Sequence, residues 1–166
     1  MELNDNTQIK FLINLCNQNR MSKKTEIMAP KTVKLLVFLA LLVHGIGHLQ
    51  GVVSGFGVKL SDKSTYRSWL LKGSSDDTNR IICITLYLGA ALFGIIAALG
   101  FKDFIVAHSL WQTFALIAAI LSTLCLVLFP YALAMFFNKA GAILMNLLIY
   151  YSILFGGAFP DAAFND

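Results

Sequence analysis

Four long apolar runs, separated by polar segments, set the pattern of this chain. They cover residues 35–58, 81–101, 109–129 and 142–159, and none of them contains Asp, Glu, Lys or Arg. A helix needs about 20 apolar residues to cross the roughly 30 Å hydrocarbon core of a bilayer, and each run is of that order. The pattern therefore predicts an all-α fold: a polytopic membrane protein built as a four-transmembrane-helix bundle.

The polar segments divide the chain into one membrane domain and two tails. We expect a polar N-terminal tail at 1–33, a transmembrane domain at 34–160 and a short C-terminal tail at 161–166. A short apolar patch at 9–16 has the spacing of an interfacial helix, but we favour a loose tail for this segment. A chain of 166 residues leaves room for one domain.

The connections between the runs carry turn and surface signals. The segment from Lys59 to Arg80 contains the breaker cluster Gly73 to Asp77, and its Trp69 favours a place at the membrane surface. Pro130 closes the third run, and the apolar residues 131–137 that follow are expected to extend the third helix beyond a kink.

Composition agrees with a lipid environment. Hydrophobic residues make up 57% of the chain and charged residues 13%, whereas soluble domains average about 25% charged residues. The net charge of +4 comes from residues in the tail and loops, where anionic lipid headgroups lie. The lipid bilayer is thus the expected partner, and nucleic-acid binding is not expected.

Lys and Arg residues indicate an orientation only weakly. With Lys102 counted beside the N-terminal tail and Lys139 beside the first loop, the two sides carry seven and six basic residues. The cluster that directly precedes the first run favours both termini in the cytoplasm, in a plasma or inner membrane.

Small residues form stripes on two of the predicted helices. Gly47, Gly51 and Gly55 repeat every four residues on the first helix, and the second helix has a matching ladder of Ala90, Gly94 and Ala98. Such stripes let backbones approach closely, either within one chain or between copies in a homo-oligomer or membrane complex. Chance also produces them, because Gly and Ala are common in membrane helices.

The first helix also carries His44 and His48, four residues apart and therefore on one helical face. Ionisable residues inside a membrane are costly and usually face the protein interior or a functional site. Counting residues along alternating helices brings several polar side chains to the same depth: Thr85, Tyr87, Ser122, Thr123, Cys125, Asn146, Tyr150 and Tyr151. From these we expect a ligand pocket formed by His44, His48, Tyr87, Ser122, Asn146 and Tyr150. His108 falls at the opposite membrane face.

Several kinds of chemistry can be weighed against this cluster. A metal ion held by His44 and His48 needs a third ligand, for which Cys125 is the first candidate and Cys83 the second. Bis-histidine haem fits poorly, because both imidazoles share one helix face. No CxxC, GxSxG or HExxH motif and no intramembrane carboxylate is present, so the sequence favours a non-catalytic protein. The plain alternative is that both histidines hydrogen-bond across the bundle.

One helix, a loop of about twenty residues and three further helices with short connections together resemble the DoxX-like small four-helix membrane proteins. The likeness covers roughly 35–159 and rests on layout rather than on a motif. It implies a redox or quinone-linked role and transfers no functional residue. No cofactor follows from the residues themselves.

Three hypotheses follow. The first is an accessory or small-molecule-binding bundle with a polar pocket around His44 and His48. The second is a membrane redox subunit or oxidoreductase that uses these histidines for a metal, a quinone or a proton. The third is a small proton-coupled transporter whose proton carrier is an imidazole.

Overall fold

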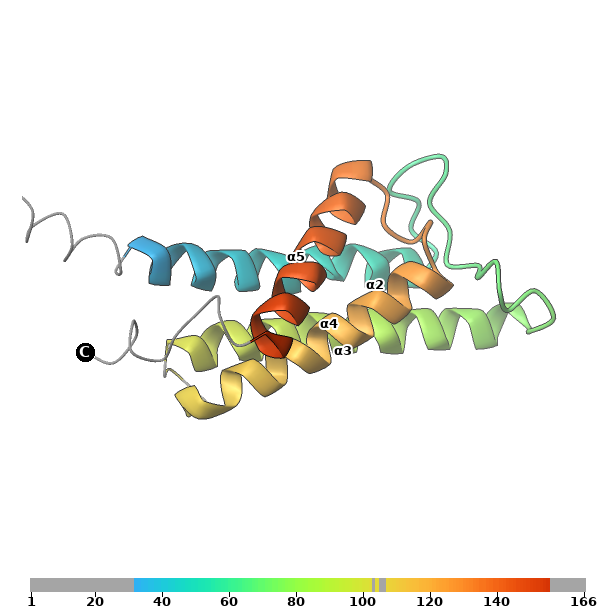
Figure 1. Ribbon diagram of the computed structural model, residues 1–166. Helices are drawn as coiled ribbons and strands as arrows, with labels where there is room; N and C mark the ends of the chain where they lie inside the picture. The colour runs from blue at the N-terminus through green and yellow to red at the C-terminus, as the bar shows by residue number, and fades with distance from the viewer. Residues whose placement is uncertain (1–31, 103, 105–106, 156–166) are drawn as a thin grey trace, which may run out of the picture.

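The computed structural model describes residues 32–102, 104 and 107–155, and every regular element in these ranges is a helix (Figure 1). The first helix covers Thr32–Gly55 and is interrupted at His48, after which its last turns form α2 (Leu49–Gly55). The other elements follow in order: α3 (Asp76–Phe101), the short 3₁₀ helix η1 (His108–Leu110), α4 (Trp111–Leu128) and α5 (Phe136–Leu154).

The first helix, α3, α4 and α5 are each long and apolar enough to cross a membrane. This confirms the predicted fold class, an all-helical membrane protein with four spanning helices. The first helix begins at Thr32, within the predicted tail 1–33. The rest of that tail with its patch at 9–16, the C-terminal tail and the last residues of the predicted fourth run lie outside the described residues.

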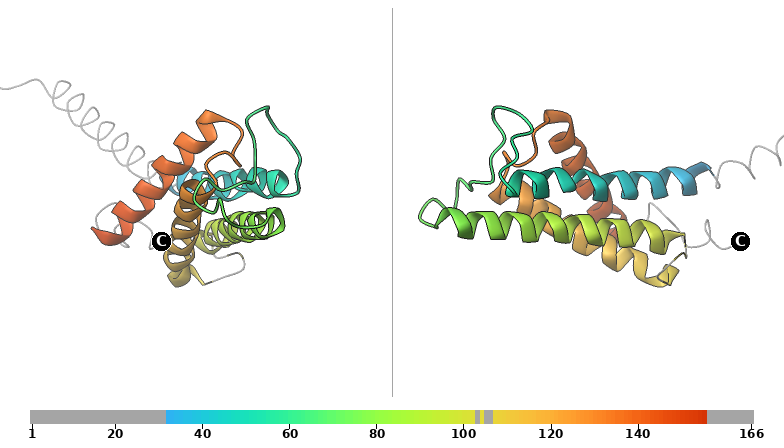
Figure 2. Two further views of the ribbon diagram at one scale, coloured as in Figure 1. Left: turned by 90° about the vertical axis from the view of Figure 1, so that its right-hand side faces the viewer. Right: turned by 180° about the vertical axis from the view of Figure 1, so that it is seen from behind.

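The first helix and α3 lie side by side and run in opposite directions, and α4 also packs along α3 (Figures 1 and 2). The last helix, α5, lies obliquely across the first helix and α4 instead of parallel to them (Figure 1). This inclination is what leaves space between α5 and part of the first helix.

Two helix starts, those of α3 and α5, differ most from the predicted runs. Helix α3 begins at Asp76, before the apolar run, because Ser75 caps it: the Thr78 amide donates to Ser75 Oγ at 3.1 Å. The expected kinked extension over 131–137 is wrong. The chain turns after Phe129, and α5 begins at Phe136, within the segment assigned to that extension.

The turn between α4 and α5 is held by donors from distant parts of the chain. The last carbonyls of a helix lack partners within that helix and must find them elsewhere. Here two side chains of the spanning helices and two groups of the first loop donate to one carbonyl in the last turn of α4 and to three carbonyls of the turn that follows it. The bonds are Ser54 Oγ to Ala132 O (2.7 Å), Tyr87 OH to Phe129 O (3.1 Å), Trp69 Nε1 to Val127 O (2.6 Å) and the Thr65 amide to Tyr131 O (3.0 Å).

The first helix meets α3 most closely at Gly45 and Gly94. A Cβ atom on Gly45 would lie 2.8 Å from the backbone nitrogen of Ile95, and one on Gly94 would lie 2.9 Å from Gly45 Cα. Further along, Gly51 packs on the ring of Tyr87 and Gly55 on Ile84. A Cβ on Gly47, in contrast, would meet nothing within 4 Å. Gly47 therefore does not belong to the packing stripe predicted from the sequence, and Gly45 does.

The interruption at His48 explains this exchange. The His48 amide donates to Gly45 O at 3.2 Å and the Gly51 amide donates to His48 O at 3.0 Å, both bonds spanning three residues instead of four. A turn of about three residues advances each position further around the axis than a turn of about 3.6. Gly45 is thereby rotated toward the face of Gly51, and Gly47 is rotated off it.

These contacts predict opposite effects of two alanine substitutions in the same helix. Gly45→Ala places a methyl group against backbone atoms of α3 and should lower the free energy of unfolding by about 1–3 kcal/mol. Gly47→Ala adds the same group in open space and should leave it unchanged or raise it by up to about 1 kcal/mol. Unfolding of the purified protein in mixed micelles measures both. Equal destabilisation by the two substitutions would contradict the close contact at Gly45.

Candidate functional site

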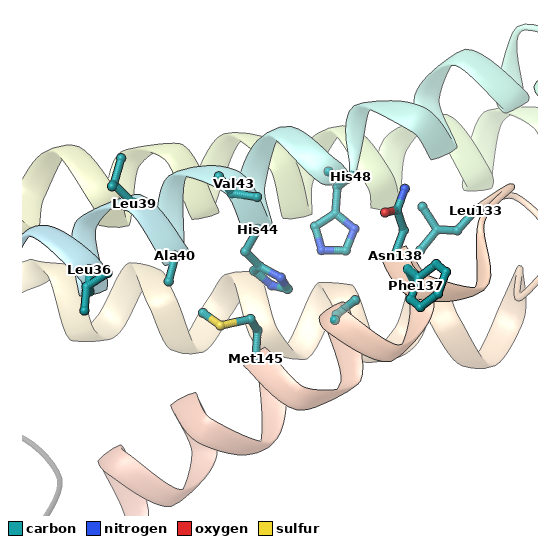
Figure 3. A pocket seen from close by; sticks show the side chains of 13 residues that line it. Leu36, Leu39, Ala40, Val43, His44, His48, Leu133, Phe137, Asn138 and Met145 are labelled. Carbon is teal, nitrogen blue, oxygen red and sulfur yellow. The ribbon is translucent and has the colours of Figure 1, made fainter.

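His44 and His48 are buried in the described part of the bundle, with 7% and 1% of their surface exposed. Their ring centroids lie 4.8 Å apart, and the ring planes are nearly perpendicular at 81°. Because Gly45 faces α3, the two imidazoles project toward α5 (Figure 3). Their side chains thus share one face of the first helix, as the spacing predicted.

The two imidazoles line a pocket of about 510 Å³ between the first helix and α5. Figure 3 shows His44 and His48 pointing into it, with Asn138 and Met145 on the opposite wall. The remaining lining is apolar: Leu36, Leu39, Ala40, Val43, Gly47, Leu133, Phe137, Gly141 and Ala142.

Three ring nitrogens at this pocket have no hydrogen-bond partner. They are Nε2 of His44 and both Nδ1 and Nε2 of His48. A buried polar group without a partner costs on the order of 1–3 kcal/mol, and inside a bilayer no water is at hand to replace the partner. These nitrogens have almost no accessible surface, so a bound molecule would satisfy them only after a small movement of the imidazoles or of the side chains that cover them.

Tyr87 lies beside the histidines but outside the pocket lining. Its ring centroid is 5.8 Å from that of His48, and its hydroxyl donates to Phe129 O. The hydroxyl is thus used to hold the turn before α5, and Tyr87 supports His48 from the side of α3.

The other predicted pocket residues form a separate polar network between α4 and α5. Asn146 Nδ2 donates to Ser122 Oγ at 2.9 Å and to Thr123 Oγ1 at 3.1 Å, and Thr123 is hydrogen-bonded to Tyr150 OH at 3.0 Å. Asn146 lies within hydrogen-bonding range of the His44 imidazole, although neither its Oδ1 nor Nε2 of His44 makes a hydrogen bond of good geometry. Ser122, Asn146 and Tyr150 therefore pack the bundle behind the pocket and do not line it.

Two residues expected at the same depth point away from the bundle: Thr85 and Tyr151 are exposed. His108 is the first residue of η1, in the connection between α3 and α4, and is not part of the first helix that carries His44 and His48.

The metal set of His44, His48 and Cys125 is not assembled. In the ranges that the structure describes, no three His, Cys, Asp or Glu side chains lie close enough to hold a metal ion. Cys125 instead packs with Cys83 and Tyr87 in a buried cluster next to Phe129, and both thiols are free. Cys83 lies 3.8 Å from Gly51 O, on the side of the first helix that faces α3.

Sequence reasoning missed the wall contributed by α5. Asn138 lines the pocket and donates from Nδ2 to Gln50 Oε1 at 2.6 Å, and Met145 lies two turns further along α5. Asn138 was overlooked because 131–137 was assigned to the third helix and the fourth was started at Ala142. A polar Asn one residue after an apolar stretch was the available signal.

The pocket places two imidazoles and one amide in an otherwise apolar lining. None of the described residues that line the pocket is Asp, Glu, Lys, Arg, Ser, Thr, Cys or Tyr. The imidazoles can therefore offer hydrogen bonds, but the lining supplies no side chain that would act as a nucleophile beside them.

Comparison with protein-family models, with curated proteins and with solved structures finds no match to this chain. The DoxX-like resemblance stays a prediction.

The network behind the pocket predicts a stabilising role for Asn146. Asn146→Leu removes two hydrogen bonds between α4 and α5 and should lower the free energy of unfolding by about 1–2 kcal/mol. Ser152→Ala is the control, because Ser152 Oγ donates only to Leu148 O within α5. Unfolding in mixed micelles compares the two. If Ser152→Ala costs as much as Asn146→Leu, the interhelix network does not hold α5 in place.

Proposed function

We propose that this protein is a membrane-embedded binding protein, accessory rather than catalytic, which takes a small lipid-soluble molecule into the pocket between the first helix and α5. The observation that carries the proposal is the set of unpaired ring nitrogens on His44 and His48 at the wall of that pocket. A ligand with a polar group would give these nitrogens the partners that the described residues do not.

The pocket is open to the bilayer along its length. Of the lining residues, Leu36 is 60% exposed, Val43 is 66% exposed and Phe137 is 84% exposed. In a membrane these side chains contact lipid, so a molecule dissolved in the bilayer reaches the histidines without passing through water. Sites that open sideways in this manner suit apolar ligands with one polar end.

The redox and transport alternatives receive less support from the pocket. A metal centre at the histidines would need a third ligand of a kind that the described lining does not offer. A quinone would occupy the same pocket as any other lipid-soluble ligand. The absorption spectrum of the bound molecule would distinguish a quinone from other ligands. Proton transport by an imidazole would require a polar path to both surfaces, and most of the lining is apolar.

For orientation, we propose that both termini lie in the cytoplasm, in a plasma or inner membrane. The cluster of basic residues that ends at Lys34, in the first turn of the first helix, supports this orientation. We do not extend the proposal to a homo-oligomer, because Gly45, Gly51 and Gly55 pack against α3 of the same chain.

Blocking the pocket tests the binding function. Gly47→Leu and Gly141→Leu each place a side chain where a Cβ meets nothing within 4 Å, so they fill the pocket from opposite walls without a clash at Cβ. Gly73→Leu adds the same side chain in open space on the first loop and serves as the control. Organic extracts of the purified full chain, analysed by mass spectrometry, should contain a bound molecule for the unsubstituted protein and for Gly73→Leu.

The extracts of Gly47→Leu, Gly141→Leu and the double variant His44→Leu with His48→Leu should lack that molecule. The proposal fails if nothing is enriched in the unsubstituted protein, or if the blocked variants retain the same molecule in the same amount.

A further inference from the structure

We propose that the ligand of this pocket is a neutral single-chain lipid whose headgroup carries hydroxyl groups, as in a monoacylglycerol. This inference rests on the proposed binding function and names the chemical class of its ligand. The shape of the pocket, the position of its polar groups and its lack of charge each point to that class.

The pocket extends along the first helix. Its lining residues on this helix begin at Leu36 and end at His48, a span of about 18 Å at 1.5 Å per residue. Between these ends, Leu39, Ala40 and Val43 continue the same face at steps of three or four residues. A groove of this form accommodates one extended hydrocarbon chain lying along the helix.

The polar groups gather at one end of the groove. His44, His48 and Asn138 lie toward the end of the first helix that leads into the first loop, whereas the stretch from Leu36 to Val43 is apolar. His48 is seven residues before Gly55, which places it roughly 10 Å from the end of this helix. Asn138 is in the first turn of α5. A lipid would therefore lie with its headgroup at the depth of His48, roughly 10 Å inside this end of the helix, and its chain directed toward the opposite end of the first helix.

The unpaired nitrogens specify a hydroxyl group. A neutral imidazole has one nitrogen that donates and one that accepts, and both nitrogens of His48 lack partners. An ester or ketone oxygen only accepts, so it would leave an accepting nitrogen unpaired. A hydroxyl group both donates and accepts, and a headgroup with two hydroxyls can also reach Nε2 of His44.

Charge excludes the ionic lipids. None of the described lining residues is Lys or Arg, so a phosphate or carboxylate would enter an apolar site without a cation. Lys139 is next to Asn138 in the sequence, but its Nζ lies over the ring of Tyr131, at 5.3 Å from the centroid. Its charge is thus engaged at that ring, outside the pocket lining.

Binding of four defined probes to the purified full chain tests this class. The probes share the oleoyl chain and differ only at the head: monooleoylglycerol, methyl oleate, oleate and oleoyl lysophosphatidate. Native mass spectrometry gives the stoichiometry and relative affinity of each. We expect one monooleoylglycerol per chain, bound at least about tenfold more tightly than each of the others, which corresponds to about 1.4 kcal/mol.

Two variants locate the bound lipid. His48→Phe keeps an aromatic ring and removes both nitrogens, so the preference for monooleoylglycerol over methyl oleate should disappear. Gly141→Leu keeps both histidines and should reduce binding of every probe, whereas Gly73→Leu should bind as the unsubstituted protein does. If His48→Phe does not fold, the Gly141→Leu and Gly73→Leu pair still decides whether the lipid occupies this pocket.

The outcomes separate the ligand class from the binding function. Equal binding of methyl oleate overturns the hydroxyl requirement, and tighter binding of oleate or the lysophosphatidate overturns neutrality. If no probe binds but the unsubstituted protein retains another molecule that Gly47→Leu loses, the lipid class is wrong and the proposed function stands. If no probe binds and no molecule is retained, both fail.

Discussion

The close backbone contact between Gly45 of the first helix and Gly94 of α3 is the constraint on which the rest of the structure depends. It fixes the rotation of the first helix, because no side chain fits between these backbones. With Gly45 turned to α3, His44 and His48 must project toward α5. The short turns at His48 keep Gly51 and Gly55 on the face that packs against α3. The first helix therefore contacts α3 along its length, and its two imidazoles stay on the side of the pocket.

Polar groups in the bundle are satisfied unevenly, and the exception marks the site. The carbonyls after α4 receive donors from the first helix, α3 and the first loop, and the hydroxyls between α4 and α5 pair with one another. Within the described spanning helices, the buried side-chain atoms left without partners are three imidazole nitrogens and Asn146 Oδ1. Since Asn146 lies beside His44, all four gather where α5 leans away from the first helix.

The four spanning helices could be predicted from the sequence, because a long apolar run without charges has few stable alternatives to a helix that crosses the bilayer. The spacing also correctly predicted that His44 and His48 share one face, since their ring centroids lie 4.8 Å apart. Sequence reasoning missed Gly45 because a regular helix would put Gly47 beside Gly51, and only the local tightening at His48 exchanges them. It missed Asn138 because a proline after α4 indicated a kink, whereas the chain makes a full turn there. The estimate of membrane depth placed Ser122 and Tyr150 beside the histidines. It carried no information on the rotation of α4 and α5, which directs these two side chains to the contact between α4 and α5.

A structure of the full chain in lipid nanodiscs at a resolution that shows bound lipid tests the account most directly. We expect that structure to show Gly45 packed against Gly94, both imidazoles facing α5, and one elongated molecule that runs along the first helix and ends at His48. Imidazoles that face the surrounding lipid, or that hydrogen-bond to protein groups across a closed pocket, would contradict it.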